Sequence, residues 1–176
     1  MLTPYYARLQ TLQADGAAVT TNGADTSMLL GQAKYTLPAS FLQFIGQELR
    51  IRAAGRISTT TGPPTIQFKV LFGAIAVFAP AAITTVASQT NQTWILDLTL
   101  TVRAVGSGTT ANLMGTGKFD ASVAVLANGG VLLPATAPAV GSGFDSTSTQ
   151  IVDLTANWSV TGNSLTCHQF SLDAAL

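Results

Sequence analysis

Apolar and polar residues alternate along most of the chain after residue 45. The clearest run is 94–105, where every second residue from Trp94 to Ala104 is apolar and most residues between them are Thr, Asp or Arg. Similar runs occupy 47–58, 65–72, 118–125 and 152–160. A period of two places successive side chains on opposite faces of a strand, so this pattern predicts antiparallel sheets with one face in a core.

Turn-forming residues separate these runs and set the expected topology. Thr161-Gly162-Asn163 predicts the tight turn of a final hairpin that joins 151–160 to 165–173. With weaker strands near 26–31 and 33–37, the chain has about eight strands. The predicted fold is therefore all-β, a two-sheet antiparallel sandwich of the jelly-roll kind.

The chain is expected to form a single domain in two parts. Residues 1–40 are predicted to form an N-terminal arm with the first short strands, and 41–176 the body of the sandwich. Helical turns are expected only at 4–13 and 38–45, and both are short. The Gly/Ala/Pro/Ser-rich stretch 127–147 is interpreted as an extended surface loop.

Charge is scarce and unevenly distributed. Charged residues make up 9% of the chain, against roughly 25% in an ordinary soluble domain. Residues 1–88 carry six basic and three acidic side chains, and 89–176 carry two basic and five acidic ones. These balances of +3 and −3 favour internal pairing between strands, with complementary subunit faces as the alternative. A neutral surface has weak self-repulsion, so a neighbour is expected to cover part of it, although secreted or adhesive β-domains share this composition.

Two partner classes are excluded by the distribution of residues. No polybasic patch is present, so we expect no nucleic-acid partner. The most apolar window, 72–83, has about twelve residues, whereas a membrane-spanning helix needs roughly 20. We therefore expect no membrane insertion.

The inventory of reactive side chains predicts no catalysis and no cofactor. Cys167 and His168 are the single cysteine and the single histidine, and neighbours in a strand point to opposite faces. One Cys and one His cannot close a zinc site within a chain. Asp97, Asp120 and Asp153 are a conceivable glycosidase set, but each is expected at a solvated position of a strand. Trp94 and Trp158 fall in phase with apolar faces and are predicted to lie in the core.

Two segments lack the alternation seen elsewhere. The last strand, 165–172, has no clearly polar face, and 72–83 is apolar throughout. Such surfaces favour a subunit interface if exposed, and full burial in the sandwich core is the equal alternative. The candidate interface residues are Phe72, Ile75, Val77, Phe78, His168, Phe170 and Leu172.

Three segments carry a resemblance to a known group of proteins. They are 46–55 (GQELRIRAAG), 94–106 (WILDLTLTVRAVG) and 153–158 (DLTANW) leading into 163–167 (NSLTC). Together they resemble small β-sandwich virion proteins of tailed bacteriophages. The resemblance implies a jelly-roll domain, assembled in the bacterial host cytoplasm, that decorates or cements a capsid or belongs to the neck or tail. It transfers no functional residues.

Three hypotheses for the function follow. The leading one is a non-enzymatic capsid decoration or cement protein, a homodimer or homotrimer that binds a major capsid or other virion protein and stabilises the assembled shell. The alternative is a neck, tail or tail-fibre component that binds a receptor or glycan through the aromatic residues Tyr5, Tyr6 and Phe144. The remote alternative is a β-sandwich enzyme that acts on glycans.

Overall fold

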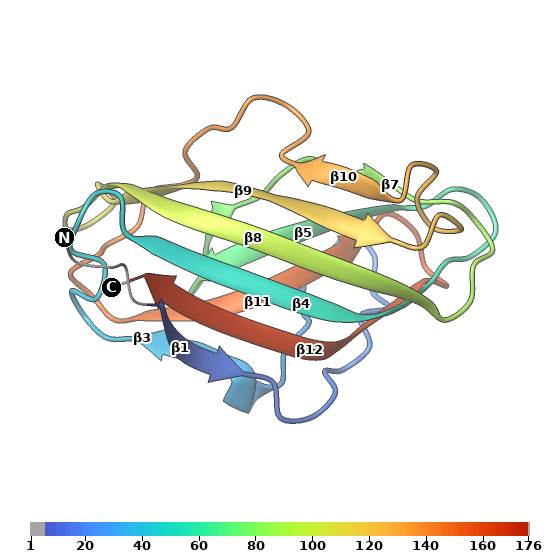
Figure 1. Ribbon diagram of the computed structural model, residues 1–176, viewed down its shortest axis with the longest axis horizontal. Coiled ribbons are helices and arrows are strands. Elements are labelled where there is room, and N and C mark those ends of the chain that lie inside the picture. Colours follow the sequence, from blue (N-terminus) through green and yellow to red (C-terminus); the bar gives the residue numbers. More distant parts are fainter. Residues whose placement is uncertain (1–5, 176) are drawn as a thin grey trace.

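The computed structural model describes residues 6–175, which form two facing antiparallel sheets (Figure 1). The first sheet has the order β1-β12-β4-β8-β9-β10, and the second has the order β2-β11-β5-β6, with β3 beside β11 and β7 beside β5. The elements are β1 (Tyr6–Thr11), β2 (Thr26–Ser27), the 3-10 turn η1 (Gly31–Ala33), β3 (Tyr35–Leu37), β4 (Glu48–Ser58), β5 (Thr65–Phe72), β6 (Ile75–Phe78), β7 (Ile83–Thr84), β8 (Gln92–Ala104), β9 (Asn112–Ala121), β10 (Gly130–Leu133), β11 (Gln150–Trp158) and β12 (Ser164–Ala175). The predicted sandwich is confirmed, with twelve strands instead of about eight.

The chain crosses repeatedly from one sheet to the other, which gives the jelly-roll order. β4 belongs to the first sheet, β5 to β7 to the second, β8 to β10 to the first, and β11 to the second. The predicted final hairpin is therefore wrong, because β11 and β12 lie in different sheets. Asn163 fixes this crossing: its buried side chain donates to the carbonyl of Val160 at 2.8 Å and accepts from the amide of Thr60 at 2.9 Å.

The core lies between the inward faces of the two sheets. Trp94 and Trp158 are fully buried, as their phase in the strands predicts. The ring of Phe68 lies 4.9 Å from that of Phe119 and 6.2 Å from that of Trp94, measured between ring centroids. Each indole N–H is satisfied by a backbone carbonyl, Arg56 for Trp94 and Val19 for Trp158, both at 3.1 Å. Buried donors that keep partners in this way avoid a desolvation penalty.

The N-terminal part of the chain is integrated into both sheets. β1 extends the first sheet beside β12, and β2 and β3 pair with β11 in the second. The expected helical turn at 4–13 is therefore wrong for 6–11, which is β1, while residues 4 and 5 lie outside the described residues. The segment 38–45 forms turns without a helix. Within 127–147, which was expected to be a loop, residues 130–133 form β10.

Ion pairs join the two oppositely charged halves of the sequence. Lys34 Nζ lies 2.7 Å from Asp153 Oδ2, Arg52 Nε lies 2.6 Å from Asp97 Oδ1, and Arg8 pairs with Asp173. Internal pairing, the favoured interpretation of the uneven charge, is thus confirmed. The solvated position expected for Asp153 is wrong: the N-terminal segment covers the outer face of β11, and this residue is only 8% exposed.

Candidate functional site

The predicted interface residues lie mostly in the core of the chain itself. Phe72, Val77, Phe78, Phe170 and Leu172 are each 5% exposed or less. Ile75 is half-buried against the same core. These side chains are covered by their own fold, so full burial, which the sequence left open, replaces the interface as their explanation.

A β-bulge explains the mixed faces of β12. The pairing of β12 with β4 shifts register between Cys167 and Gln169. Before the shift Cys167 points inward, and after it Phe170 and Leu172 do so. The extra residue, His168, changes the phase of the strand. These apolar residues of β12 therefore all point inward, and the sequence places them on two faces only because the bulge shifts the alternation by one residue.

A second register shift explains the apolar stretch in β6. The pairing of β5 with β6 shifts between Val70 and Leu71. As a result Val77 and Phe78, although adjacent, are both buried. Phe78 packs against Gly115 of β9, and the segment around Gly141 covers Val77.

The single histidine and the single cysteine lie in different surroundings. His168 Nδ1 lies 2.8 Å from Asp15 Oδ1 at the surface, whereas the thiol of Cys167 is buried, which raises its pKa to about 12. Among the residues that the structure describes, no group of three or more His, Cys, Asp or Glu side chains is placed to hold a metal ion. Across 6–175 no helix has the length and apolarity needed to cross a membrane.

Within residues 6–175, the aromatic side chain with the largest exposed fraction is Phe44, on the loop 38–47. This loop carries the chain from β3 in the second sheet to β4 in the first, at one end of the sandwich. Leu42 points inward and is 3% exposed, whereas Phe44 and Ile45 are 71% and 69% exposed. The fold therefore anchors the loop through one apolar residue and presents two others to solvent.

Hydrogen bonds to residues distant in sequence hold this loop in one conformation. The amide of Ser40 donates to the carbonyl of Ser146 at 3.0 Å, and that of Gly46 to the carbonyl of Val102 at 2.9 Å. Inside the loop the side-chain amide of Gln47 accepts from Gln43 N and donates to the carbonyl of Phe41, both at 3.1 Å. A positive φ of 91° at Gly46 completes the turn, and it suits glycine because no Cβ is present.

A cavity of about 690 Å³ opens between this loop and the end of β12. This volume lies within the range of roughly 300–1,000 Å³ that is usual for small-ligand sites. Among the described residues, 6–175, no charged side chain lines this cavity. The lining residues are Pro38, Ala39, Ser40, Phe41, Gln43, Phe44, Gly46, Gln47 and Ala175.

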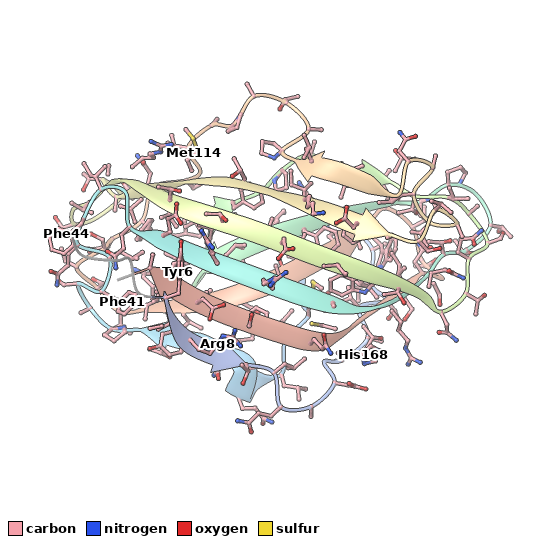
Figure 2. All side chains as sticks on the ribbon, in the orientation of Figure 1. Tyr6, Arg8, Phe41, Phe44, Met114 and His168 are labelled. Atoms are coloured by element: carbon pink, nitrogen blue, oxygen red, sulfur yellow. The ribbon has the colours of Figure 1, made fainter. Side chains whose placement is uncertain are left out.

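Tyr6 stands beside this cavity, at the same end of the molecule as Phe41 and Phe44 (Figure 2). Its backbone pairs with that of Ala175, which lines the cavity. The guanidinium carbon of Arg50 lies 4.2 Å from the centroid of the Tyr6 ring, and the Tyr6 hydroxyl lies 3.3 Å from Glu48 Oε2. These contacts hold a 39% exposed tyrosine in place.

The sequence identified this site only in part. Of the three aromatic residues proposed for binding, Tyr6 is exposed, Tyr5 lies outside the described residues, and Phe144 is wrong because it is fully buried, edge-on to Phe72. Phe44 was missed. The loop has no period of two or 3.6, so only its position between two strands of different sheets marked it as surface.

Two smaller hollows on the outer face of the first sheet are lined by charged residues. They have volumes of about 370 and 310 Å³, and both include Arg52. The guanidinium of Arg52 is paired with Asp97, and Lys118, beside the second hollow, lies 2.6 Å from Asp120. Their cations are therefore already neutralised, which favours the 38–47 loop as the candidate site.

Comparisons with known proteins give little further information. No protein-family model and no curated protein matches the chain. Among solved structures, it is similar to the CBM2 module of the evolved Dit of Lactobacillus casei BL23 phage J-1, with 9% sequence identity, 99% of each chain covered and a TM-score of 0.40. A similarity at this level assigns the chain neither a family nor a function.

Proposed function

We propose that this protein is a non-enzymatic binding module of a bacteriophage virion, and that it holds a neutral glycan at the 38–47 loop. The virion assignment is supported by the strand segments that resemble tailed-phage virion proteins. The observation that carries the binding role is Phe44, a large aromatic side chain that is 71% exposed on a loop fixed by its own hydrogen bonds. A preordered loop binds without a large entropic cost.

The chemistry of the cavity suits a sugar ring. One face of many pyranose rings presents C–H groups, which pack on aromatic rings such as those of Phe41 and Phe44. The side chains of Ser40 and Gln43 make no hydrogen bond within the described residues and lie at the cavity, where sugar hydroxyls need partners. Because the described part of the lining holds no charged group, a neutral sugar enters without desolvating an ion there.

The test is binding of the purified chain to an array of bacterial surface glycans, followed by calorimetric titration of the best one. Phe44→Ala is expected to lower the affinity by about tenfold or more, because it removes a central aromatic contact. Leu132→Ala is the matched control: Leu132 is also 71% exposed but lies on β10, away from the cavity. Absence of glycan binding, or equal losses in both variants, would contradict the proposal.

A second candidate function, capsid decoration or cementing, is favoured by Ile45. This aliphatic side chain is 69% exposed beside Phe44, and an adjacent aromatic and aliphatic pair suits a protein partner. Particles assembled without this protein would then rebind the purified chain and gain thermal stability, and Ile45→Asp would abolish both effects. In that case glycan arrays would be blank.

A further inference from the structure

The cavity at the 38–47 loop reaches the outer face of the first sheet at Ala175. This residue lines the cavity and is the last residue of β12. Its backbone pairs with Tyr6 of β1 on one side and with Glu48 of β4 on the other. Directly paired residues of antiparallel strands point their side chains to the same face. Because Leu49, the neighbour of Glu48, is fully buried, all three side chains point outward.

Tyr6, Glu48 and Arg50 contact one another on this outer face, and we call them the outer cluster. The Tyr6 hydroxyl donates to Glu48 Oε2 at 3.3 Å, so the contact spans the end of β12 that lines the cavity. The guanidinium carbon of Arg50 lies 4.2 Å from the centroid of the Tyr6 ring, and its Nη2 lies 3.4 Å from the same Glu48 oxygen. The ring is therefore held in a fixed orientation at the end of the molecule that also carries Phe44 (Figure 2).

The outer cluster keeps hydrogen-bonding capacity for a ligand. Both contacts to the Glu48 carboxylate involve Oε2, and within residues 6–175 its second oxygen, Oε1, makes no hydrogen bond. The side chains of Glu48 and Arg50 are 29% and 47% exposed. A carboxylate accepts hydrogen bonds from sugar hydroxyls and a guanidinium donates to them, and such charge-assisted bonds are stronger than neutral ones. The cluster thus combines an aromatic ring with both kinds of polar partner that a sugar needs.

We propose that the outer cluster is a second sugar subsite, so that the ligand is an oligosaccharide of at least two neutral units. This inference rests on the proposed glycan site at Phe44. The backbone of Tyr6 lies one strand spacing, roughly 5 Å, from Ala175 in the cavity wall, so adjoining units of one sugar chain can occupy the cavity and the cluster together. Glu48 and Arg50 neutralise each other, so a neutral unit meets no uncompensated charge.

The test compares the mono-, di- and trisaccharide fragments of the neutral glycan that binds best on the array, each titrated against the intact chain by NMR. Two units are expected to bind at least about tenfold more tightly than one, because the second rests on the Tyr6 ring. Tyr6→Ala is expected to remove most of this gain, since it deletes the aromatic surface of the second subsite. Phe44→Ala is expected to lower the affinities of all fragments together.

The polar part of the subsite is tested with Glu48→Gln, which keeps the shape of the side chain and removes its charge. The affinity for the disaccharide should fall about threefold or more relative to that for the monosaccharide. Asp97→Asn is the matched control, because Asp97 also faces outward, with a 33% exposed side chain paired with Arg52, but lies outside the cluster. Its ratio of the two affinities should match that of the wild type.

Three outcomes would contradict the second subsite. Equal losses for one and two units in Tyr6→Ala would mean that this residue only supports the cavity wall, and would overturn the inference. A wild-type chain that binds the monosaccharide as tightly as the disaccharide would also overturn it, while the glycan site at Phe44 would stand. A blank array would overturn both proposals.

Discussion

The ammonium group of Lys34 lies 2.7 Å from the carboxylate of Asp153 and joins the N-terminal segment to the outer face of β11. Ser27 completes the arrangement, because its hydroxyl donates to Asp153 Oδ1 at 2.7 Å. The carboxylate is nearly buried, so it depends on these two partners in place of water. This contact explains how a segment with only two short strands stays against the sheet.

Replacement of Lys34 by Met is expected to lower the free energy of unfolding by about 1–2 kcal/mol, because Asp153 keeps its charge and loses its cation. The measurement is urea denaturation. Lys118→Met is the control, since Lys118 pairs with Asp120 at 2.6 Å and its side chain is 53% exposed, so no change in stability is expected there. Equal losses of stability in the two variants would show that solvent screens the Lys34–Asp153 pair as strongly as the exposed Lys118–Asp120 pair.

Gly115 is expected to tolerate no side chain, because the ring of Phe78 occupies the space. A Cβ on Gly115 would lie 2.2 Å from Cδ2 of Phe78. Gly115→Ala should therefore cost about 1–3 kcal/mol by overpacking, measured by urea denaturation. Part of the loss should be recovered in the double variant with Phe78→Leu. Gly31→Ala, where nothing lies within 4 Å, is the control and should be nearly neutral.

These contacts also show which parts of the fold the sequence could predict. The alternation in 94–105 predicted β8 because that strand lies in the interior of its sheet with one face on the core. The same rule failed for β12 because its phase changes at the bulge between Cys167 and Gln169. The bulge lies opposite Gly55, where a Cβ would be 1.9 Å from the carbonyl oxygen of Thr166. That contact joins residues far apart in sequence, so no local pattern reveals it.

The candidate site was hidden for a related reason. The loop that carries Phe41 and Phe44 is held by hydrogen bonds that its amides Ser40 N and Gly46 N donate to carbonyls distant in sequence, those of Ser146 and Val102. The expectation of no catalysis, in contrast, rests on counting residue types and uses no structural information. Five of the seven candidate interface residues lie inside because bulges and covering segments, which composition does not show, bury them.

Acid is expected to destabilise the turn at Asp145, whose next residue, Ser146, accepts a hydrogen bond from the 38–47 loop. The hydroxyl of Thr147, the amide of Gly108 and the amide of Thr147 bond to the Asp145 carboxylate and lower its pKa from 3.8 to about 2. A lowered folded-state pKa means that this contribution to stability is full above 3.8 and is lost as the pH falls towards 2. Titration of the carboxyl carbon by NMR should show this pKa. The stability advantage over Asp145→Asn should shrink across the same interval.

The order of the 38–47 loop is expected to depend on Gln47. Gln47→Leu keeps most of the side-chain volume and removes both of its hydrogen bonds, to Gln43 N and to the carbonyl of Phe41. Hydrogen exchange at the Gln43 amide should accelerate, whereas exchange in the core strands should stay unchanged, because the loop opens locally. Glycan affinity should also be lower in Gln47→Leu, since the ligand must then order the loop that carries Phe44 on binding. Gln89→Leu is the control, because its side chain bonds Ala87 in a different loop. Unchanged exchange at Gln43 would mean that the backbone bonds to the carbonyls of Ser146 and Val102 alone order the loop.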